Sequence, residues 1–123
     1  MKKIPEQYLP VMPYLIIKNA KAFEDFTKAV LGATVRYSAP RSEGVIAHAE
    51  LQIGDAVIMY ADSTDQYNER PAGMFIYVES VDNVYAAALK YGAKNLHEPV
   101  KQPYGYSAGF EDAWGNQWWV TEP

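Results

Sequence analysis

One order of structural landmarks occurs twice in the sequence, and this repeat limits the possible folds more than any other feature. Leu31-Gly32-Ala33, at the end of a predicted helix, recurs 60 residues later as Tyr91-Gly92-Ala93. Gly54, in a predicted hairpin turn, has its counterpart 61 residues later in Gly115. Self-similarity at a fixed offset is typical of internal duplication. We therefore expect two copies of one strand–helix–strand–strand–strand unit.

The first copy spans residues 11–61. Its apolar stretch over 11–17 is short enough for a buried strand, and Asn19 can cap the following helix because its side-chain oxygen accepts a free backbone N–H. Gly32 lies where a left-handed C-terminal cap is expected. The next strands are predicted over 34–39, 45–53 and 56–61, with Gly54-Asp55 as a two-residue hairpin turn.

The second copy spans residues 73–121 and follows a polar linker over 62–72. Ser80 is the expected N-cap of its helix, and Gly92 is expected to end that helix. Residues 1–123 are expected to form a single domain, because a chain of this length buries one sufficient core. The strands of the second copy are predicted over 74–78, 94–96, 106–112 and 117–121.

Each predicted helix has one apolar stripe, which is the face expected to pack on a sheet. In the first helix the stripe consists of Phe23, Phe26 and Val30. Glu24 is assigned, with the other charged residues of this helix, to the solvent-facing side. The second helix has the stripe Val81, Tyr85 and Ala88.

Composition excludes several classes of protein. The chain contains no cysteine, which rules out disulfides, thiolate metal sites and cysteine nucleophiles. A formal net charge of −4, without a basic cluster, argues against a nucleic-acid partner. No apolar run reaches the ~18 residues of a membrane helix, and the basic N-terminus is not followed by the apolar segment of a signal peptide. We therefore expect a cytoplasmic protein without a nucleic-acid or membrane partner.

Five segments carry a family resemblance. They are Pro13-Tyr14-Leu15-Ile16, Gly32-Ala33, Ala47-His48-Ala49-Glu50-Leu51 with Ile53-Gly54-Asp55, Val78-Glu79-Ser80-Val81-Asp82, and Glu111-Asp112-Ala113-Trp114-Gly115. The chain resembles the vicinal oxygen chelate superfamily, which contains glyoxalase I, bleomycin-resistance proteins and extradiol dioxygenases, and is most similar to its PhnB-like, glyoxalase-like branch. The resemblance implies an α+β fold in which two βαβββ modules form curved mixed sheets around a concave cavity, with the helices on the convex side.

Metal enzymes of this superfamily place a His or Glu on the first and fourth strand of each copy, facing the cavity. The resemblance puts Met12 and Met59 at these positions in the first copy, and Gly73 and Trp119 in the second. None of these side chains is an ordinary ligand of a divalent cation. An alignment shift of one residue brings no His, Asp or Glu to any of the four positions. We therefore expect no metal and no other cofactor.

His48 and Glu50 are the candidates for chemistry. The Gly54-Asp55 turn fixes a register in which Glu50 faces Met59, so that both candidates point to the cavity if Met59 does. Their Cβ atoms lie roughly 6.5–7 Å apart on one strand. Together they could hold a metal ion, for which no third ligand is assigned, relay a proton, or serve as polar lining of a wet pocket or a dimer edge. His97, at the start of a predicted loop, is expected to be exposed.

Aromatic residues crowd the end of the chain. Trp118 and Trp119 point to opposite faces of one strand, and the resemblance assigns Trp119 to the cavity and Trp118 to the core. Trp119 with Met12 and Met59 would form an apolar floor for a ligand, or would fill the space itself. The further candidates for the cavity lining are Tyr14 and Tyr106.

Three functions are consistent with these patterns. The first is a metal-free small-molecule binding protein of the bleomycin-resistance kind, holding an aromatic or cationic ligand with Glu50 as counter-charge. The second is a glyoxalase-like lyase or isomerase with a non-standard metal site and His48 or Glu50 as base. The third is a dimerising scaffold without a ligand. The resemblance also implies a homodimer.

Overall fold

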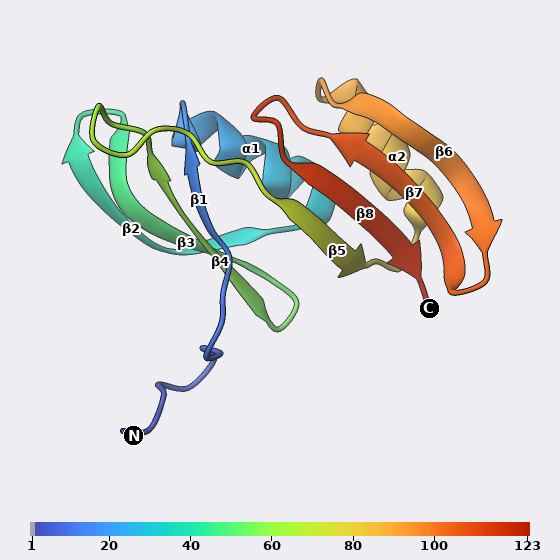
Figure 1. The fold of residues 1–123 in the computed structure, drawn as a ribbon, viewed down its shortest axis with the longest axis horizontal. Helices are drawn as coiled ribbons and strands as arrows, with labels where there is room; N and C mark the ends of the chain where they lie inside the picture. Colours follow the sequence, from blue (N-terminus) through green and yellow to red (C-terminus); the bar gives the residue numbers. More distant parts are fainter. Residues whose placement is uncertain (1) are drawn as a thin grey trace. The chain divides into compact units, whose positions relative to one another are not determined.

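The computed structural model describes residues 2–123, which divide into two compact units, one ending at Arg70 and the other running from Pro71 to Pro123. Each unit contains one four-stranded mixed sheet and one helix, in the predicted βαβββ order (Figure 1). The first unit consists of β1 (Tyr14–Ile17), α1 (Ala20–Leu31), β2 (Thr34–Ser42), β3 (Val45–Ile53) and β4 (Ala56–Asp62). The second unit consists of β5 (Gly73–Tyr77), α2 (Val81–Lys90), β6 (Lys94–Gln102), β7 (Gly105–Glu111) and β8 (Gln117–Glu122).

The two sheets have the same topology. Their strand orders are β1-β4-β3-β2 and β5-β8-β7-β6, and in each the first strand is parallel to the fourth while the other neighbours are antiparallel. The predicted hairpin register is confirmed, since Glu50 pairs with Met59 and Leu51 with Ile58. The predicted α+β fold of two modules is thus confirmed for each unit.

Both units also share a break in the strand register, which the alternation of apolar and polar residues in the sequence does not reveal. In β2 the register against β3 shifts between Val35 and Tyr37, and in β6 the register against β7 shifts between Asn95 and His97. A β-bulge of this kind places an extra residue in one strand and re-aims its side chains. The two strands that carry a bulge are also longer than predicted, and β6 runs to Gln102 instead of ending near 96.

Both helices begin at a side-chain cap, as predicted. The Asn19 Oδ1 accepts the Ala22 N–H at 3.4 Å, and the Ser80 Oγ accepts the Asn83 N–H at 3.2 Å. Gly32 adopts the left-handed conformation (φ 67°) expected after α1. These local signals fix where each helix starts and therefore which of its faces meets the sheet.

A carboxylate on the last strand of each unit binds the first N–H of that unit's helix. Asp62 on β4 accepts the N–H of Ala20 at 2.9 Å and that of Ile46 at 2.6 Å. Glu122 on β8 accepts the N–H of Val81 at 2.9 Å. A negative charge stabilises a helix N-terminus by about 0.3–1 kcal/mol. The prediction that placed Asp62 in the linker was wrong, because these bonds make it the buried end of β4.

α1 packs on β3 and β4 through its predicted apolar stripe, which is buried. Glu24 lies on the same face and is only 7% exposed, so its assignment to the solvent-facing side was wrong. The reason is a partner from the sheet, since the Tyr60 hydroxyl on β4 donates to the Glu24 carboxylate at 2.6 Å. A buried carboxylate is tolerated when it is hydrogen-bonded in this way.

The second unit's core is organised around Asp112, which precedes β8 and is buried. One carboxylate oxygen accepts the backbone N–H groups of Trp114 and Asn116, each at 2.9 Å. The other accepts the Asn116 side-chain amide at 3.0 Å and the Trp118 indole N–H at 2.9 Å. Trp118 is 1% exposed, which confirms its predicted place in the core.

No helix among residues 2–123 is both long enough and apolar enough to cross a lipid bilayer.

Candidate functional site

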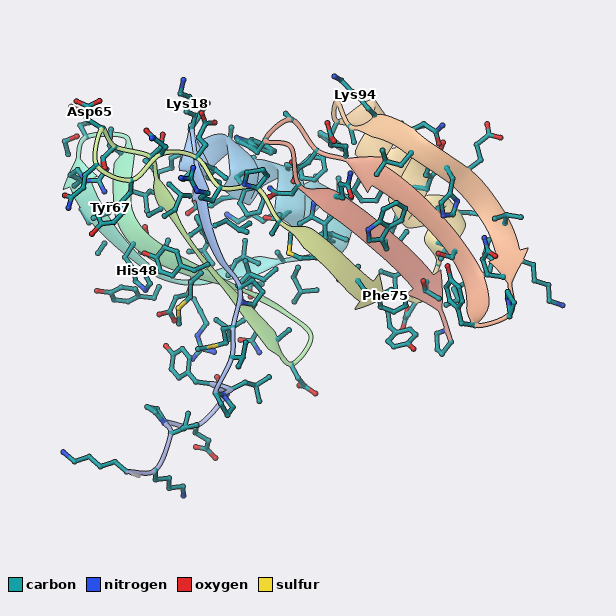
Figure 2. The ribbon with its side chains drawn as sticks, in the orientation of Figure 1. Lys18, His48, Asp65, Tyr67, Phe75 and Lys94 are labelled. Carbon is teal, nitrogen blue, oxygen red and sulfur yellow. The ribbon has the colours of Figure 1, made fainter. Side chains whose placement is uncertain are left out.

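We call the face of each sheet opposite its helix the open face. In the first unit Leu15, Leu51 and Tyr60 point to α1, so their strand neighbours point the other way. The residues of the open face therefore include Tyr14 on β1, Met59 on β4, and His48 and Glu50 on β3. Figure 2 shows the first of the two histidines, His48, on this sheet.

The bulge in β2 adds two residues to this face. Arg36 lies in the bulge, and its Nε is 3.7 Å from the Glu50 Oε1. Tyr37 pairs with Glu50, and its ring centroid is 6.0 Å from that of His48. The Arg36 guanidinium also stacks on the ring of Tyr8, at 4.9 Å from its centroid. Alternation alone would have sent Arg36 and Tyr37 to opposite faces.

A chain of hydrogen bonds joins four side chains on the open face. The Tyr14 hydroxyl lies 2.9 Å from the His48 Nδ1, and the His48 Nε2 lies 3.1 Å from the Glu50 Oε2. The Tyr8 hydroxyl donates to the Glu50 Oε1 at 2.6 Å. Tyr14 also stacks on the imidazole, with ring centroids 5.5 Å apart and an interplanar angle of 28°. This series of hydrogen bonds runs from Tyr14, which is exposed, to Glu50, whose side chain is 8% exposed.

Glu50 carries a negative charge at neutral pH. Burial raises the pKa of its carboxyl, but the hydrogen bonds from Tyr8 and His48 and the nearby charges of His48 and Arg36 outweigh burial and hold the pKa below its ordinary value. The bond to Glu50 is the main cause that raises the pKa of the Tyr8 hydroxyl. Burial raises the pKa of Tyr14, against the charge of Arg41. Both tyrosines are therefore neutral hydrogen-bonding groups at neutral pH.

The donor set of the first unit does not fit a metal centre of the superfamily type. Both ring nitrogens of His48 and both carboxylate oxygens of Glu50 already have hydrogen-bond partners. Within residues 2–123 no group of three His, Cys, Asp or Glu side chains is arranged to hold a metal ion. A stable divalent site needs at least three protein ligands, so two occupied donors are too few.

The open face of the second unit is aromatic. Trp119 on β8 pairs with Phe75 on β5 and with Gly109 on β7. Phe75 is labelled on β5 in Figure 2. The indole lies over Gly109, where an added Cβ would come within 2.4 Å of it. His97 stacks on Trp119 with ring centroids 5.8 Å apart. The expectation that His97 is exposed in a loop was wrong, because β6 continues through it and the indole half-buries it.

One predicted lining residue, Tyr106, lies elsewhere than expected. The Tyr106 hydroxyl donates to Asp82 on α2 at 2.6 Å, so this side chain lies on the helix side of its sheet, opposite Trp119. Met12 precedes β1 and is half-buried. Gly73 is the first residue of β5. The residues paired with Met59 and Trp119 are instead Tyr14 and Phe75.

Two hollows lie at strand ends, one in each unit. One, of about 560 Å³, is formed in the first unit by Lys18 and the loop after β4. The other, of about 500 Å³, is formed in the second unit between the end of β5 and the C-terminus. Neither is lined by His48, Glu50 or Trp119.

Comparison with known proteins identifies the fold. The family model described as Glyoxalase/Bleomycin resistance protein/Dioxygenase superfamily matches residues 9–120. No curated protein matches the sequence. Many solved structures match at low identity, and at such identity the likeness concerns the fold alone.

Three of these structures illustrate the range. TioX from Micromonospora sp. ML1 is 20% identical, with a TM-score of 0.74, covering 94% of this chain and 96% of that chain. A PhnB protein from Bacillus cereus is 15% identical, with a TM-score of 0.77, covering 94% and 100%. TnmS3 from Streptomyces sp. CB03234, an antibiotic binding protein, is 17% identical, with a TM-score of 0.72, covering 94% and 99%.

Proposed function

The chain belongs to the glyoxalase/bleomycin-resistance/dioxygenase superfamily, and on that premise we propose that it binds a planar aromatic small molecule, without a metal ion, on the open face of its first sheet. The observation that carries the proposal is the group of three neighbouring rings, Tyr14, His48 and Tyr37. The two tyrosines are 46% and 53% exposed. Exposed rings in contact offer stacking surface to a flat ligand.

An aromatic ligand fits this face better than a cation does. The sequence suggests Glu50 as a counter-charge, but Glu50 is buried and its oxygens are taken by Tyr8, His48 and the Arg36 ion pair. A cation would have to displace one of these partners. A stacked ring would leave all of them in place.

A buried donor beside Glu50 also supports a ligand. Of the buried side-chain nitrogens and oxygens in the described part of the chain, Arg36 Nη1 is the one that lacks a hydrogen-bond partner. Leaving a buried donor unpaired costs about 1–3 kcal/mol. A ligand group with an acceptor oxygen that reaches Nη1 would recover this energy. We therefore assign the ligand an acceptor such as a carbonyl or nitro group.

Relatives of the same fold agree with a binding role. TnmS3 is an antibiotic binding protein, and a further structure of this fold, 18% identical, is a glyoxalase/bleomycin resistance protein, also from Streptomyces sp. CB03234. A lyase or isomerase with a metal at His48 and Glu50 is the weaker alternative, because no third His, Asp or Glu in the described part of the chain joins them to hold the ion.

A homodimer is part of this proposal. Phe75 and Tyr77 on β5 are exposed, in contact with each other at 5.2 Å between ring centroids, and adjoin Tyr104. A second copy of the chain would bury such aromatic surface. Sedimentation equilibrium is expected to give twice the mass of one chain, and Phe75→Ser is expected to shift the equilibrium to the monomer. A monomer for the unchanged protein would exclude this part of the proposal.

The binding site is tested with 4-nitroanisole, a planar probe with an acceptor group, by equilibrium dialysis. We expect Tyr37→Ala to weaken its binding about three- to tenfold, the effect of losing one aromatic contact. Tyr91→Ala, which removes an equally exposed ring at the end of α2, is expected to change nothing. Phenyltrimethylammonium is the matched cation. If it binds more tightly than 4-nitroanisole, or if Tyr37→Ala and Tyr91→Ala behave alike, the proposed site is wrong.

A further inference from the structure

The hydrogen bonds of the open face of the first sheet have a fixed direction. An ionised carboxylate can only accept, so the His48 Nε2 must carry the proton that it donates to Glu50. In a neutral imidazole the other nitrogen is then an acceptor. The His48 Nδ1 therefore accepts, and the Tyr14 hydroxyl donates to it.

This direction determines what Tyr14 offers to a ligand. Its one proton is directed at His48, so the exposed side of its oxygen presents lone pairs only. Tyr14 therefore accepts a hydrogen bond from a bound molecule and cannot donate one while His48 is neutral. A ligand with an O–H group can donate a hydrogen bond to Tyr14, at the exposed end of this series of hydrogen bonds.

We propose that Tyr14, His48 and Glu50 form a general-base relay that removes the proton of an acidic O–H group, of the phenol or enol type, from the aromatic ligand of the proposed function. The proposal rests on that function for the position of the ligand and adds the chemical class of its polar group. The same arrangement of hydroxyl, imidazole and buried carboxylate moves protons in hydrolytic triads, where the carboxylate holds the imidazole in its tautomer.

The proton transfer balances within the cluster. The ligand O–H proton moves to the Tyr14 oxygen, while the Tyr14 proton moves to the His48 Nδ1. The products are a ligand anion, a neutral tyrosine that donates to this anion, and an imidazolium paired with the Glu50 carboxylate. Tyr14 is the group that touches the ligand, and His48 and Glu50 act through it.

The charged groups around His48 favour this charge distribution. Glu50 on the same strand stabilises the imidazolium, and Arg36 on β2 and the Tyr8 hydroxyl in turn hold the Glu50 carboxylate. Tyr37 on β2 contributes a neutral ring. Arg41 adds a positive charge that acts on Tyr14. A ligand anion beside Tyr14 would therefore meet the charge of Arg41 and the imidazolium, while the Glu50 carboxylate lies on the far side of the imidazole and is paired with Arg36.

The relay is tested by comparing 4-nitrophenol with 4-nitroanisole, which has the same shape but no proton. The visible band of 4-nitrophenolate reports ionisation of the bound probe directly. We expect bound 4-nitrophenol to ionise at a pH about half a unit to one unit lower than the free probe, which corresponds to roughly three- to tenfold preference for the anion. Tyr14→Phe keeps the ring and removes the hydroxyl, and is expected to abolish this shift.

The pH profile separates a relay from a merely structural role. Once His48 takes a second proton, Nδ1 becomes a donor and Tyr14 turns its own proton toward the ligand. The preference for 4-nitrophenol over 4-nitroanisole is then expected to disappear at the pH at which the His48 ring resonance titrates, and to be absent at all pH values in His48→Gln. An unshifted band for bound 4-nitrophenol, or a shift that survives Tyr14→Phe, would overturn the relay. Binding of 4-nitroanisole without that shift would leave the proposed function standing alone, whereas binding of neither probe would overturn both.

Discussion

In the first sheet the residue opposite Met59 is Glu50, and in the second sheet the residue opposite Trp119 is Gly109. The strand order, the pairing and the bulge are the same in both sheets, so this one position carries much of the difference between their open faces. The glutamate binds a tyrosine, an arginine and a histidine around one buried charge. The glycine leaves room for an indole.

The connections that follow β3 and β7 also differ in how they are stabilised. In the first unit a two-residue turn at Gly54-Asp55 joins β3 to β4, and Gln52 binds the Gly54 carbonyl from an exposed position. In the second unit the connection is longer, and its buried Asp112 accepts four hydrogen bonds. The same topology is thus fixed by turn geometry in one unit and by a buried carboxylate in the other.

The largest predicted effect tests this difference between the hairpins. Asp112→Ala is expected to lower the free energy of unfolding by about 3 kcal/mol, because it leaves buried donors of Trp118 and Asn116 without an acceptor. Gln52→Ala, at the corresponding place in the first unit, is expected to cost less than about 0.5 kcal/mol. Urea unfolding followed by circular dichroism measures both, since each unit contributes its own helix and sheet to the signal. Equal costs would contradict the comparison.

The second prediction concerns a buried pair that the first unit has and the second lacks. Tyr60→Phe is expected to cost about 2 kcal/mol, because the buried Glu24 carboxylate loses its donor. Burial, followed by the bond to Glu24, raises the pKa of Tyr60 above the ordinary value of 10.0. The folded state therefore retains this proton when the unfolded state has lost it, and stability falls as the pH rises above about 10.

Urea unfolding of the wild type and Tyr60→Phe between pH 8 and pH 11, followed by circular dichroism, checks the sign of this dependence. The variant is expected to lose less stability than the wild type over this range, since its phenyl group does not titrate. Parallel losses in the two proteins would show that Tyr60 is not the group responsible.

The third prediction tests the match between Gly109 and Trp119. Gly109→Ala is expected to cost about 1.5 kcal/mol, because the new methyl group overlaps the indole. Trp119→Met gives β8 the residue that β4 has at the corresponding position, and Gly109→Ala should cost nearly nothing in that background. A double-mutant cycle from urea unfolding provides the coupling. Additive effects would mean that the indole does not depend on the glycine.

The sequence was sufficient for the features that depend on local chemistry. The hairpin turn determined the pairing of Glu50 with Met59. Period-two alternation put Trp118 and Trp119 on opposite faces of one strand, and the family resemblance then assigned Trp118 to the core, where it lies. The caps at Asn19 and Ser80 followed from side chains that bind nearby backbone. In each case the cause lies within a few residues of its effect.

The remaining features depend on partners far apart in the chain. Glu24 is buried because Tyr60, 36 residues away, donates to it. Tyr106 turns toward its helix because Asp82 accepts its hydroxyl. Arg36 reaches the site only through a bulge, and the position of Tyr8 depends on Glu50, 42 residues away. The candidate site was therefore partly predictable: His48, Glu50 and Tyr14 were expected to line the cavity, but the residues around Glu50 and His48 that complete the cluster, Tyr8, Arg36 and Tyr37, were not.

The two histidines provide the most direct test of the ligand-binding face, because each lies on the open face of a different sheet. His48 stacks on Tyr14 in the first unit and His97 on Trp119 in the second. The Cε1–H resonances of both can be followed in one NMR titration with 4-nitroanisole. We predict a saturable shift of the His48 resonance while that of His97 stays in place. A shift of His97 at lower probe concentration, or no shift of His48 at saturation, would contradict the assignment of the ligand to the first sheet.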